Sequence, residues 1–219
     1  LTLTLDKNLQ FIVRNELINA QKIFGNVGGA GILMNINNGE ILSLVSLPDF
    51  NLNSRKDISD ASYINRATKG VYELGSVFKS FTIAAGLNYG LISKKDMFFN
   101  LEKKMRCGGR IISEYDENLS KDLSVEDILI YSSNIGSVKI GQKVGQEKLK
   151  RFLKKIGILG QLNFDIEEIG KPLAFKWRDC KLKTVSYGHG ITTTPIQLAK
   201  GYAIITNGGY DVKPTLIKK

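Results

Sequence analysis

A serine and a lysine three residues apart, Ser76 and Lys79, are the pair in this sequence best suited to covalent catalysis. Residues at this spacing in a helix share one face, about one turn apart. A serine hydroxyl is a weak nucleophile until a neighbouring base removes its proton. Lysine can be that base where burial lowers its pKa, and apolar residues follow Lys79 at positions 81 and 83–85. The spacing predicts a nucleophile and its base; the alternative is a helix-capping serine beside a surface lysine.

Other catalytic chemistries have few residues to draw on. The 219 residues contain one histidine and two cysteines. Two cysteines, Cys107 and Cys180, are too few for a zinc site or a disulfide scaffold, and the sequence favours two unrelated free thiols over one bridge. A Ser-His-Asp triad and a metal centre have little support, and His189, between two glycines, is interpreted as a loop residue.

The charge balance suits an anionic partner but does not indicate nucleic acid. The formal net charge is +10 and the sequence pI is about 9.5. Only seven of the 31 basic residues are arginine, and the lysines are spread along the chain without interleaved aromatic residues. We therefore expect no nucleic-acid partner. No stretch of 18 apolar residues is present.

The elements that must position Ser76 and Lys79 can be predicted from periodicity and turn signals. A helix over residues 6–24, capped by Asp6, precedes a hairpin of residues 30–36 and 40–46 with a two-residue Asn-Gly loop. Both strands are apolar enough to lie in a covered sheet. Residues 94–121 look irregular, with a turn at Gly108. Further helices are predicted over residues 77–88, from 124 until an interruption at 132–134, then over 135–144, 148–156 and 195–206.

Several segments together resemble one enzyme family. Residues 65–76 are similar to the segment that leads into the nucleophile of penicillin-binding proteins, and Ser132-Ser133-Asn134 resembles their S-x-N motif. Residues 3–6, 39–48 and 186–195 are similar to the class B, monofunctional members, and residues 73–76 and 187–190 look closest to division-type enzymes. The resemblance covers essentially the whole chain, in order.

This resemblance implies a fold and a set of roles. The fold would be a penicillin-binding-protein/β-lactamase-like α+β fold: a five-stranded, mostly antiparallel sheet between helices, plus an all-helical lobe that carries the S-x-N motif. Residues 1–219 would form one transpeptidase domain. Ser76 would attack the D-Ala-D-Ala carbonyl of a peptidoglycan stem peptide, Lys79 would accept its proton, and Ser132 would relay a proton to the leaving D-Ala. Asn134 would bind the substrate amide and hold the lysine, and Tyr187 would form a wall of the substrate site.

The implied reaction needs no cofactor, and β-lactams would block Ser76. The implied partners are stem peptides, a membrane glycosyltransferase and other division proteins. The implied place is the bacterial inner membrane, with an N-terminal anchor outside this chain and the catalytic domain in the periplasm. The alternatives are a serine β-lactamase or β-lactam sensor of the same fold, and a non-catalytic fragment.

The sequence departs from the family pattern at several positions. Leu74 and Ser80 stand where many members have proline, and no K-T-G motif occurs. Lys183-Thr184-Val185 precedes the Tyr187-Gly188-His189-Gly190 segment, whereas the family's third motif follows it, so we interpret this match as accidental. The motif is expected beyond Lys219, the domain is expected to be incomplete at its C-terminus, and the 219 residues alone are expected to be inactive.

Overall fold

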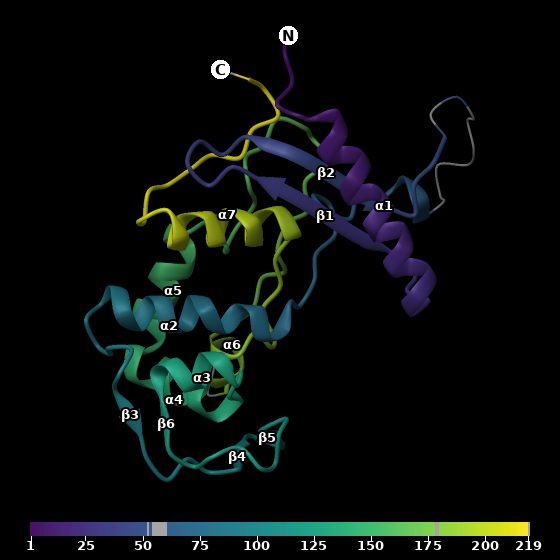
Figure 1. Ribbon diagram of the computed structural model, residues 1–219. Helices are drawn as coiled ribbons and strands as arrows, with labels where there is room; N and C mark the ends of the chain where they lie inside the picture. Colours follow the sequence, from purple (N-terminus) through teal and green to yellow (C-terminus); the bar gives the residue numbers. More distant parts are fainter. Residues whose placement is uncertain (52, 54–60, 178–179, 219) are drawn as a thin grey trace. The chain divides into compact units, whose positions relative to one another are not determined.

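The computed structural model describes residues 1–51, 53, 61–177 and 180–218 (Figure 1). They divide into two compact units, each built from segments that are distant in sequence. The first, the sheet unit, comprises Leu1–Tyr72, Ile156–Pro172 and Thr193–Lys219. The second, the helical unit, comprises Glu73–Lys155 and Leu173–Thr192. The predicted mixed α+β class is confirmed, and no helix among the described residues is long and apolar enough to cross a membrane.

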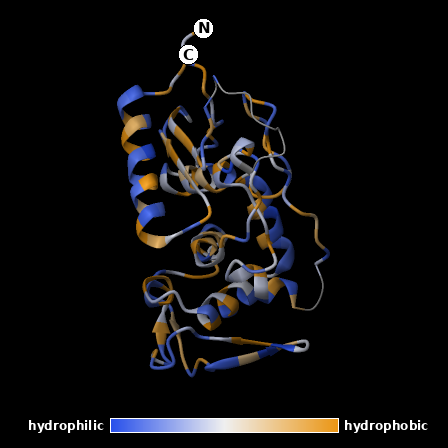
Figure 2. Ribbon diagram, turned by 90° about the vertical axis from the view of Figure 1, so that its right-hand side faces the viewer, coloured by the Kyte–Doolittle hydropathy of each residue, from blue (hydrophilic) through white to orange (hydrophobic). Residues whose placement is uncertain are grey.

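Helix α1 (Lys7–Phe24) of the sheet unit confirms the prediction for residues 6–24. The Asp6 side chain caps it by accepting hydrogen bonds from the N–H groups of Asn8 and Leu9, and Gly25 ends it in the left-handed conformation, at φ 62°. Figure 2 shows hydrophilic and hydrophobic residues alternating along this helix. The helix packs on the hairpin at Gly31, where a Cβ atom would lie only 2.6 Å from the Val13 side chain.

The predicted hairpin is present as β1 (Gly29–Met34) and β2 (Ile41–Leu47), paired antiparallel. The predicted two-residue loop is wrong. A two-residue type I′ turn needs a positive φ at both central positions, but in this loop only Gly39 has one, at 79°. Instead the side chains of Asn35 and Asn38 accept backbone hydrogen bonds within a four-residue loop, and the N–H of Asn35 donates to the carbonyl of Glu40.

Helix α7 (Pro195–Thr206) also packs against β1. Thr194 caps it through the N–H of Gln197, and Pro195 opens it, as predicted. Its Ile196 belongs to a core cluster with Ile41, Phe164 and Ile169. Isolated bridges pair Leu3 with Ile217 and Glu40 with Thr215, so the chain's last described residues lie along this unit.

The helical unit contains most of the remaining helices. They are the 3₁₀ turn η2 (Gly75–Phe78), α2 (Lys79–Asn88), α3 (Val125–Ile130), α4 (Asn134–Val144), α5 (Gln146–Lys155) and α6 (Lys181–Ser186). α2 and α4 pack against each other, and α6 packs against α4. The buried core includes Phe81, Ile128, Ile135 and Leu149. The predicted interruption at 132–134 is confirmed, because α3 ends before it and α4 begins within it.

The lobe that carries the S-x-N motif is not purely helical. Residues predicted to be irregular form the hairpin β4 (Lys104–Cys107) and β5 (Arg110–Ser113), turning at Gly108, and β3 (Met97–Phe98) pairs with β6 (Leu123–Ser124). These strands have two to four residues, too few for an alternating pattern to stand out in the sequence.

The prediction of two unrelated thiols is also wrong. Cys107, at the end of β4, forms a disulfide with Cys180, directly before α6. Their Cα atoms are 5.3 Å apart although 73 residues separate them in sequence. The tertiary fold decides this pairing, because it brings the β4–β5 hairpin to the start of α6. The spacing of the cysteines in the sequence does not predict it.

Candidate active site

Residues 75–79, called the nucleophile turn after the role predicted for Ser76, begin as a 3₁₀ turn and become α-helical only at Lys79, two residues later than predicted. Gly75 starts the turn with a φ of 61°, and the Ser76 side chain is exposed. The segment 187–190 supports this turn from beside it: a Cβ atom on Gly188 would lie 1.9 Å from the carbonyl oxygen of Gly75. The close backbone approach holds Ser76 at a fixed place at the start of α2.

Lys79 connects the two predicted halves of the site. Its side chain is only 2% exposed. Its Nζ donates to Ser76 Oγ at 3.2 Å, to Ser132 Oγ at 2.8 Å and to the Ser132 carbonyl oxygen. Burial lowers the pKa of Lys79 from 10.5 to about 8, and the charge of Glu114 works in the opposite direction. A neutral amine can keep its two N–H bonds to Ser132 while its lone pair accepts the Ser76 proton.

The S-x-N loop, residues 132–134, links α3 to α4. Ser132 has a φ of 55°, one of two non-glycine residues with a positive φ among those described. This left-handed conformation turns both its hydroxyl and its carbonyl toward Lys79. Ser133 is fully buried and caps α4 by accepting the N–H of Gly136. Asn134 donates its Nδ2 to the carbonyl of Ser113, on β5, at 2.8 Å.

Glu114 is a member of the site that the sequence analysis missed. Its carboxylate accepts hydrogen bonds from Ser133 Oγ at 2.6 Å, from the N–H of Asn134 at 2.7 Å and from the N–H of Ile135 at 3.0 Å. It follows β5, in the stretch that was predicted to be irregular. No local signal marks it, because its three partners lie 19 to 21 residues further along the chain.

Tyr187 is half-buried beside His189, with ring centroids 4.7 Å apart. Both line a cavity of about 760 Å³ that also touches Glu73 and the β4–β5 turn at Gly108. Burial raises the pKa of the Tyr187 hydroxyl, and the nearby Glu73 adds to this effect while Arg110 opposes it. The position of Tyr187 suits a wall of a binding site.

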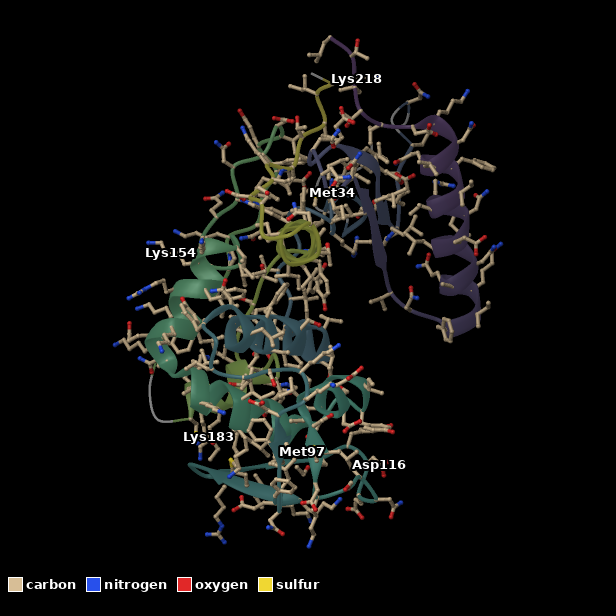
Figure 3. The ribbon with its side chains drawn as sticks, turned by 60° about the vertical axis from the view of Figure 1, so that its left-hand side comes forward. Met34, Met97, Asp116, Lys154, Lys183 and Lys218 are labelled. Atoms are coloured by element: carbon tan, nitrogen blue, oxygen red, sulfur yellow. A yellow bond between two sulfur atoms is a disulfide. The ribbon has the colours of Figure 1, made fainter. Side chains whose placement is uncertain are left out.

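Lys183, which Figure 3 labels, and its neighbour Thr184 belong to helix α6 of the helical unit. They do not lie on a strand, and Thr184 donates its hydroxyl to the carbonyl of Lys181 one turn earlier. A K-T-G motif acts from a strand whose glycine lets substrate approach the edge. The structure thus agrees with reading Lys183-Thr184-Val185 as an accidental match.

A buried lysine lies within hydrogen-bond distance of two serine hydroxyls, an arrangement that could support acyl transfer through a serine with lysine as the base. Comparison with known proteins identifies a family. Residues 29–219 match the family "Penicillin binding protein transpeptidase domain". The chain belongs to this family.

Curated relatives are similar along the chain's whole length. The probable peptidoglycan D,D-transpeptidase FtsI of Caulobacter vibrioides is 31% identical over 218 residues, which are 99% of this chain and 36% of that protein. The peptidoglycan D,D-transpeptidase FtsI of Escherichia coli K12 is 29% identical over 223 aligned residues, 100% of this chain and 37% of that protein. The chain thus spans a little more than a third of the length of these relatives.

Solved structures share the fold. The transpeptidase domain of Burkholderia pseudomallei penicillin-binding protein 3 is 26% identical with a TM-score of 0.86, covering 100% of this chain and 62% of that one. Penicillin-binding protein 3 of Mycobacterium tuberculosis, in complex with ampicillin, is 26% identical with a TM-score of 0.89, covering 99% and 48%. The predicted penicillin-binding-protein fold is thereby confirmed.

Proposed function

We propose that the protein is a peptidoglycan D,D-transpeptidase that cross-links stem peptides through an acyl-enzyme on Ser76. The proposal rests on one observation above all: the buried Nζ of Lys79 lies within hydrogen-bond distance of both Ser76 Oγ and Ser132 Oγ. A base with a pKa of about 8 is partly neutral near pH 7. It can therefore take the Ser76 proton without help from a histidine.

The proposed reaction has two halves. In the first, Ser76 Oγ bonds to the carbonyl carbon of the penultimate D-Ala and its proton passes to Lys79. The bond to the terminal D-Ala nitrogen then breaks, and that nitrogen receives the proton from Lys79 through the Ser132 hydroxyl. In the second half, an amine of another stem peptide attacks the ester, gives its proton back along the same route, and frees Ser76.

The roles of the remaining residues follow from their places around this route. Asn134 stands beside Ser132 at the start of α4 and contacts β5 through its amide nitrogen, so its oxygen is left to accept an N–H from the substrate peptide. Tyr187, on the wall of the neighbouring cavity, would flank the stem peptide. A β-lactam would acylate Ser76 in the same way and remain bound to it.

We further propose that the domain works in septal wall synthesis on the periplasmic side of the inner membrane, alongside a membrane glycosyltransferase and other division proteins. The names of the FtsI relatives support the first part. The Cys107–Cys180 disulfide supports the compartment, because disulfides persist in the oxidising bacterial periplasm and are rare in the reducing cytosol.

The decisive experiment uses the full-length protein and a fluorescent penicillin. Wild type should be labelled, and a digest should place the adduct on the peptide that contains Ser76. Ser76→Ala should not be labelled, whereas Ser80→Ala, four residues further along the chain at the start of α2, should be labelled normally. An adduct on another peptide would refute the assignment of Ser76. Rapid release of hydrolysed penicillin would show a β-lactamase instead.

A further inference from the structure

The S-x-N loop has a conformation that its own residues do not favour. A left-handed φ is strained for a non-glycine residue, and Ser132 has one, at 55°. Such a conformation persists only where the surroundings over-determine it. Ser132 donates its N–H to the Leu129 carbonyl at 3.2 Å, and its carbonyl and hydroxyl accept from Lys79 Nζ. The residues that follow Ser132 add a second set of restraints on the loop.

Glu114 supplies these restraints. Its carboxylate accepts three hydrogen bonds from the two residues after Ser132 and from Ile135 beyond them, and the three distances lie between 2.6 and 3.0 Å. Hydrogen bonds to a carboxylate are shorter and stronger than bonds between neutral groups. The two N–H donors belong to the first turn of α4, where backbone N–H groups lack partners within the helix and a negative charge is stabilising.

Neighbouring contacts fix Glu114 in turn. Its N–H donates to the Lys103 carbonyl at 3.3 Å, and the Asn134 amide binds the carbonyl of Ser113, the residue before it. The β4–β5 hairpin and the S-x-N loop are therefore joined by both the backbone and the side chain of consecutive residues. A shift of Glu114 would shift the loop with it.

We propose that Glu114 is a positioning residue for proton transfer, which holds the Ser132 hydroxyl and carbonyl against the Lys79 amine. It acts through the loop rather than by touching the substrate. Its charge has a second effect, since Glu114 partly offsets the lowering of the Lys79 pKa by burial. Removing the charge of Glu114 should lower the Lys79 pKa further. Disturbing the hydrogen bonds from Glu114 to the loop should slow proton transfer.

Two substitutions separate these effects, and the kinetic part rests on the proposed function. Glu114→Gln keeps the length of the side chain but loses the charge and places an NH₂ group against an N–H donor. Glu114→Asp keeps the charge and shortens the side chain by one methylene. Glu117→Gln is the matched control, because Glu117 is an exposed acid three residues further along the same segment.

Penicillin acylation of the full-length protein should be measured from pH 6 to 10. We expect both Glu114 variants to acylate about 10- to 100-fold more slowly at the plateau. In Glu114→Gln the rise of the rate with pH should also move to lower pH, and in Glu114→Asp it should stay near the wild-type position. Glu117→Gln should match wild type in both respects. A Glu114→Gln protein with the wild-type rate and pH profile would overturn the proposal.

A second measurement needs no reaction. The ¹³Cε resonance of Lys79, titrated by NMR in protein labelled at lysine, should give a lower pKa in Glu114→Gln than in wild type, and no change in Glu117→Gln. An unchanged Lys79 pKa in Glu114→Gln would count against the inference even if penicillin failed to label wild type. Failure to label wild type, with the pKa shifted as expected, would refute the proposed function alone. The Glu114→Asp variant keeps the test valid if Glu114→Gln does not fold.

Discussion

The nucleophile turn and the S-x-N loop both present a serine to Lys79, but they are built in different ways. In the turn, Ser76 and Lys79 are three residues apart, and this spacing places them on one face. In the loop, Ser132 adopts a left-handed conformation that is held by a carboxylate at position 114 and by a hairpin tied to α6 through a disulfide. The turn is thus a local structure, whereas the loop depends on contacts between distant parts of the chain.

This difference has a consequence for mutation. Apart from segment 187–190, which packs against Gly75, few distant residues should influence the positions of Ser76 and Lys79. The loop should be sensitive to residues that never touch substrate, because its conformation is not the one that its own sequence prefers.

The largest effect should come from replacing Lys79, the proposed base, which both regions contact. Lys79→Arg keeps a positive charge but cannot deprotonate near neutral pH. Because a positioned general base contributes about 10²- to 10⁴-fold, acylation by penicillin should fall by that factor. The same exchange at Lys150, exposed on α5, should change nothing. A Lys79→Arg protein that melts like wild type and is acylated at the normal rate would exclude Lys79 as the base.

The disulfide should stabilise the part of the unit that carries the S-x-N loop and should leave the nucleophile turn unchanged. Its cysteines are 73 residues apart. Closing a loop of that length reduces the conformational entropy of the unfolded chain, which stabilises the folded state by about 4 kcal/mol at most. The double variant Cys107→Ser/Cys180→Ser should have a free energy of unfolding that is lower by up to that amount, as measured by urea denaturation. Reductant should have the same effect on wild type and none on the double variant. Equal midpoints for wild type with and without reductant would contradict the bridge.

The features that the sequence predicts are also the local ones, and those that it misses depend on distant contacts. Asp6, Thr194 and the S-x-x-K spacing act within one helical turn. The helices that begin at Asp6 and Thr194 were predicted correctly, and the helix at Lys79 begins two residues later than predicted. Glu114 and the Cys107–Cys180 pair act between segments far apart in sequence, and neither was predicted. The residue types alone could not show these contacts.

The hairpin loop at Gly39 shows a subtler limit. The Asn-Gly pair marks the turn correctly, but Asn35 and Asn38 compete for backbone N–H groups and enlarge the loop to four residues. The position of a turn is therefore easier to predict than its type, because asparagine side chains can form such hydrogen bonds in turns of several types.

A smaller effect is expected where the turn itself depends on a neighbour. Gly188 has a φ of 86°, and a Cβ atom there would lie 1.9 Å from the Gly75 carbonyl oxygen. Gly188→Ala should cost about 3 kcal/mol in unfolding free energy, through left-handed strain together with the displaced turn, and should slow acylation. Gly25→Ala is the control: Gly25 has a left-handed φ of 62° with no atom within 4 Å of its Cβ position, so only the strain, about 1 kcal/mol, should be seen. Equal losses for both would mean that segment 187–190 does not support the nucleophile turn.

The smallest effect is the dependence of acylation on pH, and it reports the environment that the turn and the loop create together. With a Lys79 pKa of about 8, only the neutral amine, about a tenth of the total at pH 7, can accept the Ser76 proton. The second-order rate constant for penicillin should rise about tenfold per pH unit below pH 8, which is about 1.4 kcal/mol in activation free energy, and level off above pH 8.

The pKa of Lys79 in the folded state lies below the unfolded value of 10.5, so the folded state binds fewer protons between these two values. The free energy of unfolding should therefore gain a favourable contribution from Lys79 as the pH rises from about 8 to about 10.5, and lack it below 8. Lys79→Met, which does not titrate, should lose that contribution to the pH dependence of stability. A rate constant that is flat between pH 6 and 8 would show that the proton leaves Ser76 by another route, and that the contacts of Lys79 with Ser132 serve structure rather than proton transfer.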